Sequence, residues 1–396
     1  MRKYSLFFYL LLIFIVQFSA YSQVKLNHQT KAARSTDIPI ESIDRELYVV
    51  RGIRDSSSLW IDAKSLTVEG MGWTSENMIE DFTRLPNKYQ DTVTENVWSL
   101  SRHSAGIHIR FIVKGTREIK ASWVLRAERS MPHMTLQAIN GLDLYVKHDG
   151  QWVFAGTGKP AAKGVKHESL LTKNLNHREA YECMLYLPLY NGVASLELGF
   201  DTSAVVQKAP PFVEKPMVFY GTSILHGCSA SRSGMSFSSM LGRKYNTPVV
   251  NLGFSGNGLT EPYFGQIMGE IDASIFVVDC LPNMYEFTKE EVTERTIALV
   301  RNIRKYRPVT PVVLVEDRTH THFSAYKSEN IRRAGLKSAY ELLSRETQYI
   351  YYVEGENLLG NNNEATADGS HPSDLGMYYY FQALDPVIGR LLKKND

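Results

Sequence analysis

Alternating apolar and polar positions dominate the first half of the chain. Residues 107–114 and 119–126 both place apolar side chains at every second position. A period of two is typical of a β-strand with one face in a core and the other toward solvent. Because no helical pattern interrupts such segments between about residues 47 and 200, the first half is expected to form an all-β sandwich or jelly roll.

Two dipeptides predict tight turns between these strands. Asp149 and Gly150 separate two apolar runs, and Asn191 and Gly192 separate two others. Asp-Gly and Asn-Gly favour two-residue hairpin turns, so each pair of runs is expected to form a hairpin. Pro188 falls inside one arm of the second hairpin. Because proline cannot donate a ladder hydrogen bond, it indicates an edge strand.

The second half changes to short apolar runs that alternate with helical patterns. The clearest helix covers residues 289–306, where Thr288 and Glu291 have the spacing of a capping box and Pro308 follows the end. Strand–helix alternation predicts an α/β fold with a parallel sheet and helices on both faces. The strands are expected at residues 217–220, 248–252, 274–278, 311–315 and 349–353.

The start of the chain has the pattern of a secretory signal peptide over residues 1–22. Arg2 and Lys3 precede an apolar run over residues 6–16, and small residues follow at the expected cleavage point. The run is shorter than the ~20 residues that span a bilayer. We expect an exported protein, periplasmic or extracellular, with no stable membrane anchor; an anchor left in place is the alternative.

A proline-rich segment divides the remainder. Residues 208–216 contain three prolines and few large apolar residues, which predicts a semi-rigid linker. The expected organisation is a β-sandwich accessory domain over residues 23–207 and a second domain over residues 217–396.

Composition removes several classes of function. The 396 residues are 43% hydrophobic and 22% charged, as in globular proteins. The formal net charge is +2, and it is near zero without Arg2 and Lys3, so no footprint for nucleic acid is expected. Cys183, Cys228 and Cys280 match no zinc pattern and are interpreted as buried small hydrophobes, with a Cys228–Cys280 disulfide as the alternative.

Candidate chemistry gathers where the strands of the second half end. Unusual segments follow the first three strands, at residues 221–227, 251–258 and 279–283, and another covers residues 368–372. Because parallel strands bring their carboxyl ends to one edge of the sheet, these segments are expected to meet there. Each segment alone is also consistent with a helix cap or a turn.

Together the segments supply the groups of a serine hydrolase. Ser223 is the candidate nucleophile, His371 the base that takes its proton, and Asp368 the carboxylate that orients the imidazole. The amides of Ser223 and Gly256 and the side-chain amide of Asn283 are the candidate donors to the developing oxyanion. No cofactor and no metal is expected in this chemistry.

The order of these motifs resembles the four blocks of the SGNH (GDSL-type) esterase/acylhydrolase superfamily. Gly-Thr-Ser, Asn-x-Gly-x-x-Gly-Asn, Pro-Asn and Asp-x-x-His lie within residues 217–396. The resemblance implies a flavodoxin-like three-layer α/β/α fold without a metal, with the same five residues in the roles above. Two blocks depart from the family pattern. Thr222 replaces an aspartate, and the third block reads Leu281-Pro282-Asn283-Met284 where Gly-x-Asn-Asp is usual.

A second, independent resemblance lies in the first half. Residues 141–145 read Gly-Leu-Asp-Leu-Tyr and resemble the Gly-x-Asp-Leu-Tyr module that precedes such catalytic domains in Bacteroidetes-like exported hydrolases. The implied function is a serine esterase acting on short acyl esters, above all O-acetyl groups on carbohydrate, with a small-molecule or oligosaccharide ester as substrate. A lipid acylhydrolase and a non-catalytic carbohydrate-binding relative are the alternatives. His320 and His322 stay open between a substrate-contacting rim, a metal-binding pair and a solvated loop.

Overall fold

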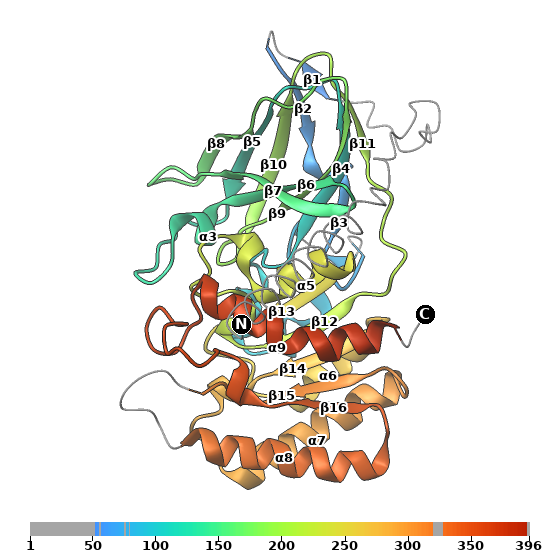
Figure 1. Ribbon diagram of the computed structural model, residues 1–396, viewed down its shortest axis with the longest axis vertical. Helices are drawn as coiled ribbons and strands as arrows, with labels where there is room; N and C mark the ends of the chain where they lie inside the picture. The colour runs from blue at the N-terminus through green and yellow to red at the C-terminus, as the bar shows by residue number, and fades with distance from the viewer. Residues whose placement is uncertain (1–51, 55–56, 75–76, 79, 320–327, 394–396) are drawn as a thin grey trace, which may run out of the picture.

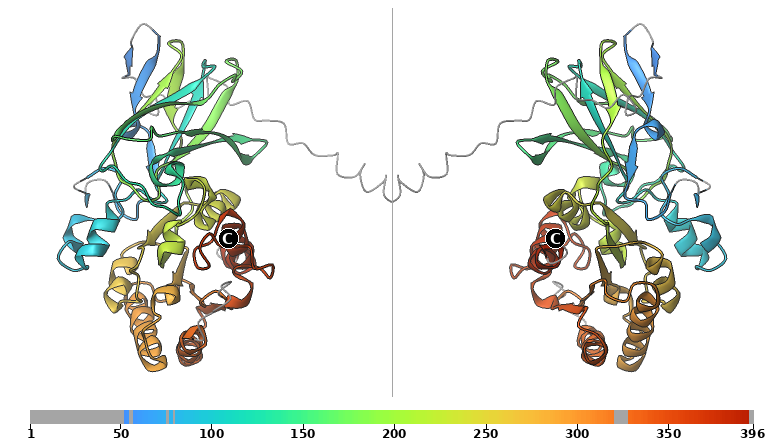
Figure 2. Two further views of the ribbon diagram at one scale, coloured as in Figure 1. Left: turned by 90° about the vertical axis from the view of Figure 1, so that its left-hand side faces the viewer. Right: turned by 90° about the vertical axis from the view of Figure 1, so that its right-hand side faces the viewer.

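The computed structural model describes residues 52–54, 57–74, 77–78, 80–319 and 328–393. The predicted signal peptide and the pair His320 and His322 lie outside these residues. Two antiparallel sheets occupy one end of the molecule, and a parallel sheet with its helices occupies the other (Figures 1 and 2). No helix in the described part of the chain has the length and apolar character needed to cross a membrane.

The two antiparallel sheets enclose one apolar core. One has the strand order β1-β2-β10-β5-β8; the other has the order β11-β4-β9-β6-β7, with β3 paired to β4. Alternate residues of β4 and β5 enter the shared core, as the period of two predicts. The first sheet consists of β1 (Ile53–Arg54), β2 (Leu59–Asp62), β5 (Ile119–Leu125), β8 (Lys166–Thr172) and β10 (Val193–Phe200). The second consists of β3 (Thr67–Glu69), β4 (His108–Lys114), β6 (Leu142–His148), β7 (Gln151–Gly158), β9 (Ala180–Tyr186) and β11 (Val205–Lys208).

One of the two predicted hairpins is confirmed and the other is wrong. β6 pairs with β7 across Asp149 and Gly150, which have the positive φ angles (49° and 77°) that this turn needs. β9 and β10, in contrast, belong to different sheets, so the chain crosses between sheets at Asn191. The edge-strand prediction from Pro188 is also wrong, because β9 ends before this proline and pairs with β4 and β6 on its two sides.

Helices interrupt the first half, contrary to the sequence prediction. α2 (Glu95–Ser101) and α3 (Leu136–Asn140) begin at Thr94 and Thr135, whose side chains accept backbone hydrogen bonds of the first turn. Both helices are too short to give a helical period that stands out from the surrounding alternation.

The parallel sheet has the strand order β13-β12-β14-β15-β16, the order of flavodoxin-like folds, as predicted. All four strand pairings are parallel, so the carboxyl ends meet at one edge. The sheet order reverses at β12, which places the end of this strand at the topological switch point. The strands are β12 (Met217–Gly221), β13 (Val249–Gly253), β14 (Ile275–Asp279), β15 (Val312–Val315) and β16 (Ile350–Val353).

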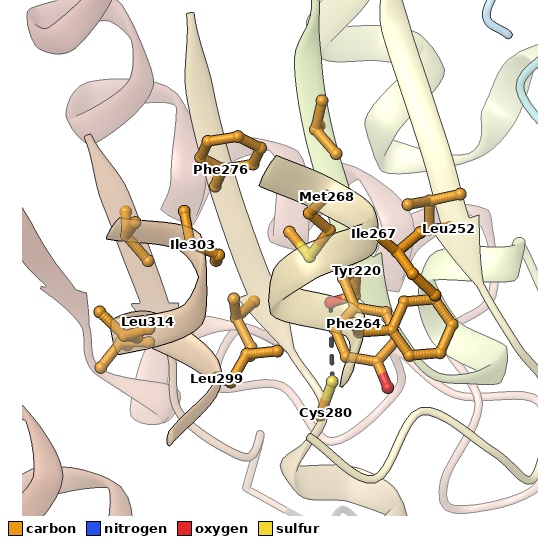
Figure 3. Close-up of a cluster of buried hydrophobic side chains, with 14 of the residues drawn as sticks. Tyr220, Leu252, Phe264, Ile267, Met268, Phe276, Cys280, Leu299, Ile303 and Leu314 are labelled. Carbon is orange, nitrogen blue, oxygen red and sulfur yellow. Dashed lines mark hydrogen bonds between the residues drawn. The ribbon is translucent and has the colours of Figure 1, made fainter. Parts of the chain in front are cut away.

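Helices cover both faces of the parallel sheet. Phe264 stacks on Tyr220 of β12 with ring centroids 4.2 Å apart, in the layer that Figure 3 shows. Thr288 and Glu291 form the predicted capping box at the start of the long helix. One layer consists of α6 (Pro262–Gly269), α7 (Lys289–Tyr306) and α8 (Ser328–Glu346), and the other of α4 (Ser223–His226), α5 (Phe237–Tyr245) and α9 (Asp374–Lys393).

The first half of the chain also supplies part of the core beneath α6. Leu85, Tyr89, Val93 and Val97 are buried in one cluster with residues of the parallel sheet. In Figure 2 the light-blue segment that contains α2 lies beside the helices of this sheet. Strand alternation alone does not predict this contribution.

Candidate active site

Ser223 lies at the point where β12 turns into α4. Thr222 is extended, and its side chain accepts a hydrogen bond from the amide of Ile224. The residue that departs from the family pattern therefore caps the helix. Gly227 ends α4 with a φ of 102°, a left-handed conformation that favours glycine. The short helix holds Ser223 in place, and only 6% of this residue is exposed.

His371 and Asp368 reach the serine from the turn before α9. Nε2 of His371 lies 2.9 Å from Oγ of Ser223, and Nδ1 lies 2.7 Å from Oδ2 of Asp368. The other carboxylate oxygen accepts the backbone amides of Ser370 and His371 at 3.0 and 2.7 Å. Partial burial acts to raise the pKa of Asp368, but these amides and the imidazole outweigh it and hold the pKa below its usual value. The structure thus brings the three predicted residues into one hydrogen-bonded series.

Gly256 and Asn283 lie on two neighbouring loops at the same sheet edge. Gly256 has a φ of 65°, and a Cβ atom there would meet nothing within 4 Å. Asn283 donates its side-chain amide to the carbonyl of Asn257. Within the described chain no hydrogen bond joins Gly256 or Asn283 to Ser223. Asn283 is therefore tied to the loop that carries Gly256, and Gly256 itself faces open space.

The altered third block has an apolar anchor. Met284, in place of the usual aspartate, is fully buried, and its Sδ lies 3.2 Å from the hydroxyl oxygen of Thr260. Asn283 is at the end of a single 3-10 turn that begins after β14. Burial of Met284 fixes the loop by packing instead of by a carboxylate.

Arg84 was missed by the sequence analysis, because no motif surrounds it. This buried side chain comes from the first half of the chain and donates to the carbonyls of Asn251 (3.2 Å) and Gly253 (2.6 Å) at the end of β13. It also donates to the carbonyls of Leu100 and His103. Burial lowers the pKa of Arg84 to about 9, which still leaves the guanidinium charged at neutral pH. Arg84 therefore fixes the strand end that precedes the Gly256 loop.

An aromatic cluster contacts the backbone of Ser223. Tyr190 donates to the carbonyl of Ser223 at 3.3 Å, and its ring stacks on His226 with centroids 4.1 Å apart. Nδ1 of His103 lies 3.4 Å from Nε2 of His226. Burial and the nearby guanidinium of Arg84 lower the pKa of both histidines far below the usual value. These neutral rings are part of the interior.

The Gly-Leu-Asp-Leu-Tyr segment joins the two halves. Asp143 accepts a hydrogen bond from Arg232 at 2.9 Å and from the amide of Gly234 at 2.7 Å. Arg232 also donates to the hydroxyl of Tyr145 at 2.7 Å, and a Cβ at Gly234 would overlap this tyrosine. Because Asp143 is 1% exposed, this is a desolvated ion pair between β6 and the segment before α5.

His133, from the loop between β5 and α3, reaches the active site. Its ring lies face to face with that of His371, with centroids 5.6 Å apart and planes 21° from parallel. The backbone carbonyl of His133 accepts a hydrogen bond from Ser229, just after α4. The first half of the chain therefore contributes a side chain beside the imidazole, which neither a motif nor a spacing indicated.

All three cysteines are free and buried. The interpretation as small hydrophobes is confirmed, and the alternative Cys228–Cys280 disulfide is wrong. Cys280 lies in the core of Figure 3, where its thiol points to the carbonyl of Tyr220 at 3.7 Å. Cys228 lies below the active site, at the end of the turn that carries Ser223.

Comparisons with known proteins agree with this geometry. The model of the GDSL-like lipase/acylhydrolase family matches residues 214–389. The model of the GxDLY N-terminus of SGNH-hydrolase-type esterases matches residues 58–206. A search of curated protein sequences gave no match.

Three solved structures resemble the whole architecture. A protein of Bacteroides ovatus, assigned as a GDSL-like lipase, is 34% identical, with 84% of this chain and 98% of that chain covered and a TM-score of 0.77. A salicylyl-acyltransferase from a tetracycline biosynthetic pathway is 16% identical, with 85% and 98% covered and a TM-score of 0.69. A family two carbohydrate esterase from Clostridium thermocellum, solved with cellohexaose, is 15% identical, with 73% and 93% covered and a TM-score of 0.55.

At these identities the last two structures show the fold alone, whereas the first extends over nearly the full length of its chain. Together with the two family models and the chemistry at the strand ends, the similarity to the Bacteroides ovatus protein establishes that this chain belongs to the GDSL-like lipase/acylhydrolase family and is an esterase of the SGNH type.

Proposed function

We propose that the chain is an exported serine esterase that removes short acyl groups, chiefly O-acetyl groups, from carbohydrates. The observation that carries the proposal is the series from Ser223 through His371 to Asp368, with distances of 2.9 and 2.7 Å. A hydroxyl beside an imidazole that is itself held by a carboxylate is the arrangement that activates serine for acyl transfer.

In the proposed reaction, the ionised Asp368 accepts a hydrogen bond from Nδ1–H of His371, which keeps the proton on Nδ1 and leaves Nε2 free to take the hydroxyl proton of Ser223. The serine oxygen attacks the ester carbonyl, and the negative charge forms on the carbonyl oxygen. The amides of Ser223 and Gly256 and the side-chain amide of Asn283 stabilise this charge; loss of one such donor typically costs about 3 kcal/mol. The ester C–O bond to the sugar then breaks, and His371 gives its proton to the departing sugar oxygen, which leaves as a hydroxyl.

The second half of the cycle uses the same groups. A water molecule gives a proton to His371 and attacks the acyl-serine, and the proton passes to Ser223 as the carboxylic acid leaves. The open face at Gly256 supports this assignment, because no side chain of that residue takes the place of the substrate oxygen.

The carbohydrate substrate is supported by architecture. The family two carbohydrate esterase, solved with cellohexaose, is similar over 73% of this chain, a share that includes residues of both halves. A secretory pattern over residues 1–22 suits an enzyme that meets polysaccharide fragments outside the cytoplasm.

The test compares p-nitrophenyl acetate with the butyrate and octanoate esters, and then measures acetate released from a panel of acetylated oligosaccharides. We expect a preference for the acetyl ester and a loss of several orders of magnitude in kcat/KM for Ser223→Ala. Ser344→Ala, an exposed serine of α8, is the matched control. A preference for octanoate would favour a lipid acylhydrolase, and a folded protein without turnover would favour a carbohydrate-binding relative.

A further inference from the structure

Three side chains of different origin converge beside the catalytic imidazole. One ring nitrogen each of His133 and His371 and the thiol sulfur of Cys228 all lie within 4.8 Å of one another. His133 comes from the loop after β5, Cys228 from the turn just after α4, and His371 from the turn before α9. The cluster therefore exists only when the two halves of the chain are packed together.

These atoms have the chemistry of a transition-metal site. Imidazole nitrogen and thiolate sulfur are ligands of Zn²⁺, at about 2.0–2.1 and 2.3 Å. Tetrahedral coordination places two such ligands roughly 3.5 Å apart, so closure of the present triangle needs movements of about 1 Å. Three protein ligands leave a fourth position for water.

The loop that carries His133 is held in place, and the buried thiol of Cys228 is reached from solvent past His371. The hydroxyl of Thr135 donates to the carbonyl of Ser231 at 2.5 Å, and Ser231 in turn binds Asp374 of α9, so the loop of His133 is fixed to the elements that carry the other two ligands. Within the described residues no hydrogen bond engages the ring nitrogens of His133. The side chain of His371 is 26% exposed, which gives an ion a route from solvent.

We propose that His133, Cys228 and His371 form an inhibitory binding site for Zn²⁺. Binding replaces the thiol proton of Cys228, which is released to solvent, and forms one sulfur–zinc and two nitrogen–zinc bonds. Each ring nitrogen of His371 already has a catalytic partner, Ser223 or Asp368. Whichever nitrogen binds the ion, the series is broken, and the esterase is switched off reversibly.

The inhibition rests on the proposed role of His371 as base, but the binding does not. Binding is therefore measured first, without substrate, by competition of the purified protein with a chromophoric zinc chelator. We expect one Zn²⁺ per chain at micromolar concentration. Cys228→Ala and His133→Phe should each weaken binding at least about tenfold; phenylalanine keeps a ring beside His371 but offers no nitrogen.

The control is Cys183→Ala, which removes a buried thiol of β9 that does not belong to the cluster. It should bind Zn²⁺ like the unaltered chain. Binding that survives in Cys228→Ala or His133→Phe, or no binding in the unaltered chain, would overturn the site. Each variant is also checked by circular dichroism. A spectrum equal to that of the unaltered chain shows that weaker binding comes from the lost ligand and not from unfolding.

Activity is measured second, as the rate with p-nitrophenyl acetate relative to the metal-free rate of each variant. Micromolar Zn²⁺ should reduce the rate of the unaltered chain more than tenfold, and a chelator should restore it. Mg²⁺ and Ca²⁺, which prefer oxygen ligands, should have no effect. Zinc that binds the three ligands without slowing the enzyme would refute the inhibition. If the chain hydrolyses no ester, the proposed function fails while the binding assay still decides the site.

Discussion

Asp279 provides the most quantitative test of the energetics at the sheet edge. This residue ends β14, opposite Gly221 of β12, and is 1% exposed. Neither of its carboxylate oxygens has a hydrogen-bond partner in the described structure. Burial raises the pKa of Asp279 to about 7; Arg318 opposes this effect, and Asp317 adds to it. The hydroxyl of Tyr380 also interacts electrostatically with Asp279.

The shift of the pKa can be converted into stability. In the unfolded chain the carboxyl has its usual pKa of 3.8, and in the folded chain it keeps its proton up to about pH 7. Because the folded state binds the extra proton, the contribution of Asp279 to stability is fully present below pH 3.8 and is lost as the pH rises toward 7. At 1.36 kcal/mol for each pH unit, the loss amounts to about 4 kcal/mol.

The perturbation is Asp279→Asn, which keeps the shape and has no proton to release. Urea denaturation is followed at pH 4.5, 6.0, 7.0 and 8.5 for the variant, the unaltered chain and Asp91→Asn, an exposed carboxylate. The substitution also alters local contacts, which shifts the unfolding free energy by the same amount at every pH. We therefore compare how the difference in unfolding free energy between the variant and the unaltered chain changes with pH. The variant should gain on the unaltered chain by about 3–4 kcal/mol between the lowest and highest pH.

Two results would refute this reasoning. A difference that stays constant from pH 4.5 to 8.5 would mean that Asp279 does not titrate in this range. A variant that loses stability relative to the unaltered chain as the pH rises would mean that a charged Asp279 stabilises the fold through Arg318. The control Asp91→Asn should follow the unaltered chain at every pH.

Three further substitutions test the site and the contact between the halves. Asp368→Asn should lower kcat/KM for p-nitrophenyl acetate by about three to four orders of magnitude with little change in stability, because the imidazole loses its orienting charge; a rate within tenfold of the unaltered enzyme would contradict this. Arg84→Met removes the hydrogen-bond donor from two carbonyls at the end of β13 and from those of Leu100 and His103, and should cost about 3 kcal/mol or more in urea denaturation; an unchanged midpoint would mean that packing alone holds this strand end. Asp143→Asn weakens the buried ion pair with Arg232 and should lower the free energy of unfolding by about 2 kcal/mol, whereas Asp149→Asn in an exposed turn should leave it unchanged. Equal effects of the two substitutions would mean that the ion pair does not stabilise the fold.

The parallel sheet and its chemistry were predictable because their signals are local. Each strand is a short buried run, and Thr288 with Glu291 starts a helix by contacts within four residues. Ser223, Asp368 and His371 follow strand ends or lead into α9, and the edge at which they meet follows from the parallel order.

The errors concern partners that lie far away in the sequence. Asn191 precedes a glycine, as in a hairpin, but its side chain is buried and donates to the carbonyl of Ala127 and to Asn140. These tertiary hydrogen bonds override the local turn preference, and the strands on either side enter different sheets. Arg84 and His133 could not be predicted for the same reason. Their contacts with the site are to a carbonyl and a ring more than 100 residues away in the sequence.

The apolar residues that the first half inserts beneath α6 limit how this enzyme can be divided. A gene fragment that begins at residue 217 would lack Leu85, Tyr89, Val93 and Val97 and would expose the sheet face that they cover. It would also lose Arg84 and His133. Recombination between related genes should therefore transmit both halves together, and an isolated hydrolase fragment should be recovered from cells as insoluble aggregate.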